Sequence, residues 1–256
     1  MLKTVISGAA LMAVTATTAF ADAEGRHDAW GELLDRYVVE NSDGVNRFNY
    51  GGLKASEDDR AQLDAYLASF ADLDFDTLSQ DEQFAAYSNI YNALTVKHIT
   101  ERYPVRSIRS GYLIGPWKRV KTEIDGEQQS LDAIEHKILR PMGDARVHYV
   151  INCAAWGCPN LRAEPILAEG LDETLDEAAR DYVNHPRGVS IRSNGGLQVS
   201  TIYKWFQEDF GDSKQDVVEH LLEYAEPELA EQIKSNARIR NYAYDWALND
   251  APDGTS

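Results

Sequence analysis

The side chains best suited to chemistry are two cysteines, Cys153 and Cys158, which follow His148 closely in the sequence. A histidine can act as a general base, and a thiol can act as a nucleophile or as a redox partner. Pro159 suits the first position of a helical turn, which would make Cys158 its capping residue. Because a thiol at a helix N-terminus ionises more easily, we expect Cys158 to be the first candidate for thiol chemistry and Cys153 the second.

The same three residues also allow interpretations without a nucleophilic thiol. Two cysteines this close in an oxidising compartment tend to form a disulfide, either structural or redox-active. Together with His148 they could instead hold zinc, although their spacing differs from that of a zinc ribbon. His148 by itself could be a hydrogen-bonded core residue. We expect no metal and no cofactor.

Two further groups of polar residues could contribute to binding. Glu135 and His136 are neighbours on an expected helix and face different directions, whereas His136 and Arg140 share a face that could meet an anion. That face could equally be a solvated edge of the helix. Asn89 and Asn92 lie three residues apart on a longer helix. Buried amides there could orient a histidine or donate to an oxyanion, and they could equally hold a loop.

The longer helix is expected to begin after Ser79 and to end near Arg102. Ser79 and Glu82 have the spacing of a capping box, and Pro104 limits continuation of the helix. Apolar residues cover nearly the whole circumference, which predicts a central, buried helix. The strip expected to face solvent is narrow and comprises Ala86, Ala93, Lys97 and Thr100.

The residues around the histidine predict a strand. The segment from Arg146 to Cys153 alternates, and on an extended strand His148 and Cys153 would face opposite sides about 16 Å apart, which disfavours a direct dyad. Asp125-Gly126 predicts a hairpin turn after an alternating stretch, and further strands are expected at 189–191, 196–200 and 238–248. The fold class is therefore α+β, with a helix-rich N-terminal half and a central buried helix packed on a small antiparallel sheet.

The first 21 residues have the features of an export signal. Lys3 gives a positive start, Val5 to Val14 form a short apolar core, and Ala19-Phe20-Ala21 resembles a cleavage site. The apolar core is too short to span a membrane. We therefore expect cleavage after Ala21 and a periplasmic protein without a stable membrane anchor.

The rest of the chain has no repeats and no linker rich in Pro, Gly or Ser, which predicts one domain over 22–250 and a disordered tail over 251–256. The net charge is −17 at pH 7. A surface this acidic repels nucleic acid and anionic lipid. The expected partner is therefore a small molecule or a peptide.

Several motifs occur together in one order along the chain. They are Asn89-Ile90-Tyr91-Asn92-Ala93-Leu94, Ser130-Leu131 with Ile134-Glu135-His136 and Leu139-Arg140, His148 with Cys153 and Cys158-Pro159, Trp205 with Asp209-Phe210, and Tyr244-Asp245-Trp246 with Leu248-Asn249. In this combination the sequence resembles the bacterial and plant family known as domain of unknown function 547, over nearly the whole expected mature chain. The resemblance implies a shared domain and no particular activity.

The expected order of a long helix and a histidine-bearing strand also loosely resembles papain-like and transglutaminase-like folds, with Asn92 where those folds place a thiol. We therefore hypothesise a cleft in which His148 is the general acid or base. Asn92 would orient the histidine or polarise the reacting group by donating to an oxyanion. Cys158 or Cys153 would supply the thiol for acyl transfer, hydrolysis or thiol–disulfide exchange. The competing hypothesis is a non-catalytic binding domain in which the two cysteines form a structural disulfide.

Overall fold

The computed structural model describes residues 25–251 with the exception of residue 194. The predicted export signal, with its cleavage site after Ala21, lies outside the described residues, as do residues 252–256 of the predicted tail. Ala251, the first residue of that tail, is buried and donates its backbone N–H to the carbonyl oxygen of Phe48 at 3.0 Å. The prediction of a disordered tail is therefore wrong for Ala251.

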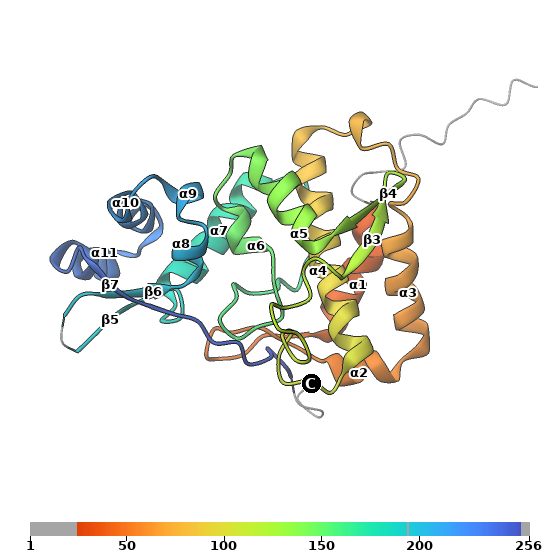
Figure 1. The fold of residues 1–256 in the computed structure, drawn as a ribbon, viewed down its shortest axis with the longest axis horizontal. Helices are drawn as coiled ribbons and strands as arrows, with labels where there is room; N and C mark the ends of the chain where they lie inside the picture. Colours follow the sequence, from red (N-terminus) through yellow and green to blue (C-terminus); the bar gives the residue numbers. More distant parts are fainter. Residues whose placement is uncertain (1–24, 194, 252–256) are drawn as a thin grey trace, which may run out of the picture.

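The helices and strands fall into two groups along the chain. The first half contains η1 (Gly25–His27), α1 (Asp28–Tyr37), β1 (Val38–Val39), β2 (Arg47–Phe48), α2 (Tyr50–Ala55), α3 (Glu57–Ala68), η2 (Phe75–Thr77), α4 (Gln80–Arg102), β3 (Lys121–Ile124) and β4 (Glu127–Ser130). The second half contains α5 (Leu131–Ala133), the π-helix η3 (Ile134–Leu139), η4 (Arg140–Met142), α6 (Val147–Val150), α7 (Leu171–Asn184), β5 (Val189–Ile191), β6 (Leu197–Ser200), α8 (Ile202–Trp205), α9 (Gln207–Phe210), α10 (Lys214–Tyr224), α11 (Pro227–Ser235) and β7 (Ile239–Ala243). Helices α1–α5 gather at one end of the molecule, and α8–α11 with the three-stranded sheet form the other end (Figure 1). Among the described helices, none is both long and apolar enough to cross a membrane.

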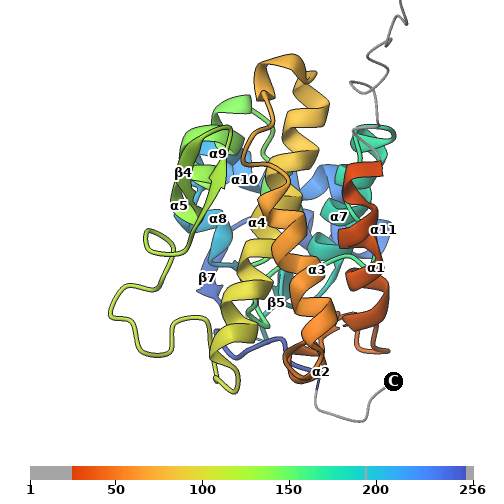
Figure 2. The ribbon, with the colours of Figure 1, turned by 90° about the vertical axis from the view of Figure 1, so that its right-hand side faces the viewer.

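Helix α4 is the central buried helix that its pattern predicts. Ser79 Oγ accepts the backbone N–H of Glu82, and the Glu82 carboxylate accepts the backbone N–H of Ser79, so the capping box is confirmed. The helix packs against α2, α3 and η3, and Figure 2 shows it between α3 and the β4–α5 segment. The predicted solvent-facing strip is wrong because these neighbours cover it, leaving Lys97 as its one partly exposed member; Ala86, Ala93 and Thr100 are buried.

The sheets are small, and the α+β class is confirmed. Strands β3 and β4 form the predicted antiparallel hairpin, with Asp125 and Gly126 at positive φ in its turn. Two residues at positive φ give the twist that a two-residue hairpin needs. Strand β5 pairs with β6 in antiparallel fashion, as the pattern at 189–200 predicts, whereas β7 joins β6 in parallel.

The predicted strand from Arg146 to Cys153 is wrong, because residues 147–150 form the short helix α6. All four residues of α6 are buried, so the segment has no solvent-exposed face. A short run that is buried on every side cannot be assigned to a strand or a helix by its pattern alone. The resemblance to papain-like and transglutaminase-like folds is not confirmed, since the histidine-bearing strand on which it depended is absent.

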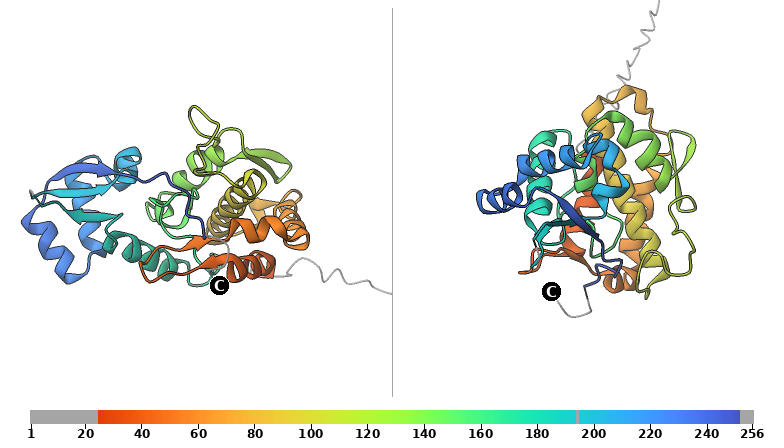
Figure 3. Two further views of the ribbon diagram at one scale, coloured as in Figure 1. Left: turned by 90° about the horizontal axis from the view of Figure 1, so that it is seen from below. Right: turned by 60° about the vertical axis from the view of Figure 1, so that its left-hand side comes forward.

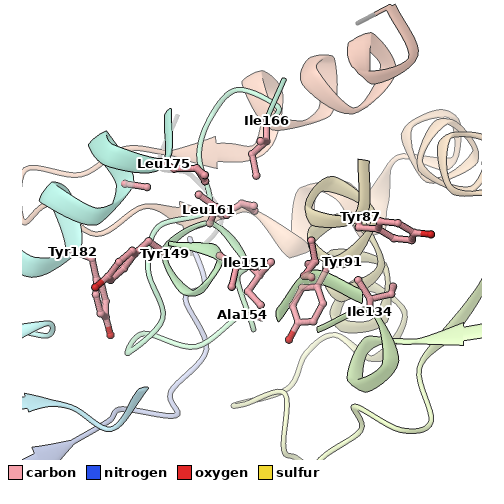
Figure 4. Close-up of a cluster of buried hydrophobic side chains, with 14 of the residues drawn as sticks. Tyr87, Tyr91, Ile134, Tyr149, Ile151, Ala154, Leu161, Ile166, Leu175 and Tyr182 are labelled. Atoms are coloured by element: carbon pink, nitrogen blue, oxygen red, sulfur yellow. The ribbon is translucent and has the colours of Figure 1, made fainter. Parts of the chain in front are cut away.

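The core extends without a break between the two ends of the molecule. Tyr87, Tyr91 and Ile134 pack on the side of α4, and Tyr149 with Tyr182 packs on the side of α6 and α7 (Figure 4). Ile151, Ala154, Leu161 and Ile166 lie between the two groups in the loop that follows α6. The view from below shows this loop region between the N-terminal helices and the distal sheet (Figure 3). The loop carries both cysteines, so the core fixes their position.

Candidate functional site

A cavity of about 640 Å³, called here the central cavity, lies among residues of α4, η3, α6, α8 and the segments around the cysteines and after β7. Its lining combines aromatic rings with a few titratable groups. The lining includes Tyr91, Trp117, Glu135, His136, His148, Cys153, Cys158, Trp205, Phe206, Tyr244 and Trp246. A mainly apolar cavity with a few convergent polar groups is the usual form of a small-molecule site.

His148 is held in this wall by a carboxylate and an aromatic ring. Its Nε2 lies 2.6 Å from Oδ2 of Asp209 in α9, and its ring stacks on Phe206 with centroids 4.1 Å apart. The side chain is almost fully buried. Within the described residues, Nε2 is the one ring nitrogen with a hydrogen-bond partner. When the neutral ring donates from Nε2, its Nδ1 is therefore the available proton acceptor.

Burial and charge act in opposite directions on this pair. Burial lowers the pKa of His148 below 6.5, and Asp209 partly opposes that effect. Burial alone would raise the pKa of Asp209, but its hydrogen bonds with His148 and Arg140 outweigh burial and hold the pKa at about 2. At neutral pH the pair is therefore an imidazole base beside an ionised carboxylate, the arrangement that orients general-base histidines.

Arg140 binds the same carboxylate as His148. Its Nε donates to Asp209 Oδ2 at 2.6 Å, and its Nη2 donates to Asp209 Oδ1 at 2.9 Å. Arg140 also contacts the Glu208 carboxylate, and its Nη1 lies 2.8 Å from Nδ1 of His136. The anion that Arg140 meets in this structure is therefore the protein's own Asp209, and Arg140 acts by positioning that carboxylate.

Glu135 supplies a second titratable group in the central cavity. Its side chain is buried, and the Tyr91 hydroxyl donates to its Oε2 at 3.1 Å. Burial raises the pKa of Glu135 to about 7, although the Tyr91 hydrogen bond and the Arg140 charge oppose the rise. A carboxyl group with this pKa can give or take a proton near neutral pH. His136 also lines the cavity, with its pKa lowered by partial burial and by Arg140.

The two cysteines form a disulfide bond in the cavity wall. Cys158 is buried, whereas Cys153 is partly exposed. The Tyr244 hydroxyl lies 3.0 Å from each sulfur, and the backbone N–H of Cys153 donates to Cys158 Sγ at 3.0 Å. The predicted helical turn at Pro159 is wrong, because the chain after Cys158 is irregular, so no helix N-terminus activates that sulfur.

The cysteine loop is fixed by short contacts with the C-terminal segment. Trp156 donates its backbone N–H to Ala247 at 2.7 Å, and Gly157 donates to Asp245 at 2.9 Å. A Cβ atom on Gly157 would lie 2.8 Å from the backbone nitrogen of Asp245, so this approach requires glycine. These contacts bring Tyr244 against the disulfide.

Asn92 and Asn89 lie outside the cavity lining, and both hold loops. Asn92 donates to the carbonyl of Val150 at 2.8 Å and accepts the backbone N–H of Asn152 at 2.7 Å. Asn89 makes the equivalent pair of bonds with the backbone of Ile166. Asn92 therefore fixes the backbone between His148 and the cysteines, and the loop-holding interpretation of the two amides is the one that the geometry supports.

The structure thus brings most of the candidate residues into one wall. His148, Cys153, Cys158, Glu135 and His136 line the central cavity, whereas Arg140 lies outside the lining and binds Asp209, and the two asparagines position loops. Asp209 and Tyr244 complete the site. They lie 61 and 86 residues from the side chains they contact, so the family motifs were the only sequence signal for them.

The cysteine, histidine and carboxylate groups do not form a metal site within the described residues. Both sulfurs are used in the disulfide, and a disulfide sulfur lacks the thiolate charge that zinc prefers. The zinc interpretation of Cys153, Cys158 and His148 therefore does not fit the oxidised protein.

Residues 75–183 match the model of the family described as Protein of unknown function, DUF547. The matched segment includes α4, η3, α6 and the cysteine loop, whereas Asp209 and Tyr244 lie beyond it. The match is therefore shorter than the motifs predict. No curated protein and no solved structure matches the chain. Over residues 75–183 the family resemblance is confirmed, because this segment matches the DUF547 model.

Proposed function

We propose that the central cavity binds a mainly apolar small molecule or peptide segment and catalyses hydrolysis or acyl transfer on it, with His148 as the general base. One observation carries this proposal: His148 Nε2 lies 2.6 Å from Asp209 Oδ2 in the cavity wall. A carboxylate at this position selects the tautomer of the ring and stabilises the imidazolium that forms when the base takes a proton.

The proposed step uses water as the nucleophile while the disulfide is intact. Nδ1 of His148 takes a proton from water as the oxygen forms a bond to the acyl carbon. The bond from that carbon to the leaving group then breaks, and the leaving group receives a proton from the imidazolium or from protonated Glu135. In protein reduced by a dithiol, a cysteine thiol could replace water and form an acyl-enzyme.

The lining of the central cavity supports an apolar ligand. The rings of Trp205 and Tyr244 lie 4.9 Å apart, and those of Tyr244 and Trp246 lie 4.6 Å apart. Leu113 and Ile114 lie on a loop beside the cavity and are 99% and 90% exposed. Fully exposed large apolar residues at a cavity are typical of a ligand-contact surface.

Hydrolysis of p-nitrophenyl butyrate, an acyl ester with a short apolar chain, tests the proposal. The His148→Asn variant should lose about 100-fold or more of the protein-catalysed rate, because general-base catalysis contributes at least that much. The matched control is His185→Asn, since His185 lies outside the cavity lining and contacts the Asp43 carbonyl. Equal rates for His148→Asn and wild type would contradict the assignment. Saturable binding of the ester without turnover would favour the non-catalytic binding domain instead.

Thiol–disulfide exchange is a second candidate, because a partly exposed disulfide sulfur faces the cavity. An attacking thiolate would bond to Cys153 Sγ and release Cys158 as a thiolate. The N–H of Cys153 and the hydroxyl of Tyr244 are positioned to stabilise that released charge. Equilibration with glutathione buffers would test the role: a redox-active pair exchanges within the range of cellular thiol buffers, whereas a structural pair stays oxidised.

We also propose that the protein is exported and matures by cleavage after Ala21. The n-region, apolar core and small residues of the first 21 positions support this, and a disulfide is typical of oxidising compartments. Mass spectrometry of protein from a periplasmic extract should find a mature N-terminus at Asp22. Protein that keeps Met1 to Ala21 and stays in the cytosol would contradict the proposal.

A further inference from the structure

The three-stranded sheet carries a concentration of positive charge that contrasts with the rest of the chain. The chain contains 42 acidic residues, yet none of them falls in 182–207 or in 232–244. These two segments supply all of the sheet. They carry the basic residues Arg187, Arg192, Lys204, Lys234, Arg238 and Arg240. A positive field confined to one sheet of an otherwise acidic protein favours binding of an anion at that sheet.

The pairing of β6 with β7 brings four of these cations to one hollow. Leu197 donates its backbone N–H to the carbonyl of Arg238 at 3.0 Å, which places the turn after β5 beside the entry to β7. Arg238 and Arg240 flank the buried Ile239 and therefore share the opposite face of the strand. A second cavity of about 710 Å³, the basic cavity, is lined by Arg192, Lys234, Arg238 and Arg240 and by the backbone around them. The three-stranded sheet that supplies Arg240 and adjoins Arg192 lies away from α4, at the other end of the molecule (Figure 1, Figure 3).

The backbone of the basic cavity is held in place by one asparagine. Asn236 accepts the backbone N–H of Gly196 and donates to the carbonyl of Gln232, so it ties the β5–β6 turn to α11. Gly196 has a φ of 90°, and a Cβ atom there would collide with the side chain of Arg240. The turn therefore packs directly against an arginine that lines the cavity.

The cations of the basic cavity are short of partners within the protein. Among the described residues, Lys234 has an ion pair with Glu231 at 3.0 Å, and Arg192, Arg238 and Arg240 have none. By contrast, Arg146 near α6 is paired with three aspartates. Unpaired guanidinium groups present planar pairs of donors that match phosphate or sulfate oxygens.

We propose that the basic cavity is a second ligand site that binds a small soluble molecule with several phosphate or sulfate groups. Its size and its concave lining suit a compact anion. The negative charge of the rest of the molecule opposes approach to an extended anionic surface, because the net charge is −17. This site shares no lining residue with the central cavity, so its test is independent of the proposed function.

Calorimetric titration of the full chain with inorganic tripolyphosphate at low ionic strength tests the proposal. Wild type should bind saturably. The double variant Arg238→Gln/Arg240→Gln should weaken the affinity by about tenfold or more, since each lost guanidinium group removes charge-assisted hydrogen bonds. Lys121→Gln/Lys137→Gln is the control with the same change in net charge, at two exposed lysines outside the basic cavity. The control should keep the affinity of wild type within about twofold.

Three results would overturn the proposal. The first is that wild type does not bind tripolyphosphate saturably. The second is that both double variants lose the same affinity. The third is that the protein binds phosphatidylglycerol vesicles through the same arginines but does not bind tripolyphosphate, which would assign the basic cavity to a lipid surface. Circular dichroism of both variants verifies folding, which the exposed positions of all four substituted side chains favour.

Discussion

Oδ2 of Asp209 accepts hydrogen bonds from two cationic or basic partners at once, with His148 Nε2 and Arg140 Nε each 2.6 Å away. Three elements, α6, η4 and α9, therefore meet at one carboxylate. The hydrogen bonds with His148 and Arg140 together keep the carboxylate ionised, and the carboxylate orients the imidazole. The protonation of His148 consequently depends on a residue that does not line the central cavity.

Replacement of Asp209 should change the titration of His148 in a defined direction. In Asp209→Asn the negative charge that favours the imidazolium is lost, while burial remains, so the pKa of His148 should fall further below 6.5. NMR of the histidine ring carbons over about pH 4 to pH 8 measures this.

The control for that titration is Glu208→Gln. Glu208 also contacts Arg140, but it has no bond to His148. Its replacement should leave the titration of His148 unchanged. A similar shift in both variants would mean that Arg140, and not the direct hydrogen bond, dominates the protonation of the histidine.

Local features of the site were predictable from the sequence, and long-range ones were not. The capping box at Ser79, the buried helix that follows it and the hairpin turn at Asp125 depend on near neighbours, and all are confirmed. The contact between His148 and Asp209 depends on how α6 and α9 pack, which no local pattern specifies.

The error at His148 has a physical reason of the same kind. The alternating pattern predicts a strand with one face in solvent, but tertiary packing buries every side of 147–150. On a helix His148 no longer has to face away from the cysteines. One cavity wall therefore includes both the imidazole and the sulfurs, which the extended strand would have separated.

Glu135 should make the stability of the protein fall as the pH rises. Its folded-state pKa of about 7 lies above the usual value of 4.5, mainly because of burial, so the folded protein binds more protons between those two pH values. The stability is fully present below about pH 4.5 and decreases up to about pH 7, by roughly 3 kcal/mol in free energy of unfolding. Urea unfolding at about pH 5 and pH 8 should show that Glu135→Gln lacks this decrease.

The matched control for this measurement is Glu127→Gln, at an exposed position of the β3–β4 hairpin. It should keep the pH dependence of wild type. If Glu135→Gln loses as much stability as wild type between the two pH values, the buried carboxyl is not the source of the effect.

Asn92 should be essential for the backbone that carries the site. Asn92→Ala leaves the carbonyl of Val150 and the N–H of Asn152 without their partner, and the free energy of unfolding should fall by about 2 kcal/mol or more. Ser88→Ala on the same helix is the control, because the Ser88 hydroxyl is buried without a hydrogen bond among the described residues. Its removal should be neutral or stabilising in the same denaturant titration. If both variants lose the same free energy of unfolding, the loss comes from the smaller side chain on α4 and not from the hydrogen bonds of Asn92.

The two cysteines should differ in reactivity once the disulfide is reduced, in the order opposite to that expected from the sequence. The preference for Cys158 rests on a helix that begins at Pro159, and the irregular chain there removes that reason. Cys153 is partly exposed in the cavity wall, whereas Cys158 is buried, so iodoacetamide should label Cys153 first. Peptide mass spectrometry after brief labelling of protein reduced under native conditions measures the order. The Cys158→Ser variant should keep its labelling and Cys153→Ser should lose most of it, and the reverse pattern would restore Cys158 as the accessible sulfur.

Reduction itself should cost roughly 2 kcal/mol of stability, the chain-entropy value for so short a loop. A labelling order measured well below the denaturation midpoint therefore reports the folded site.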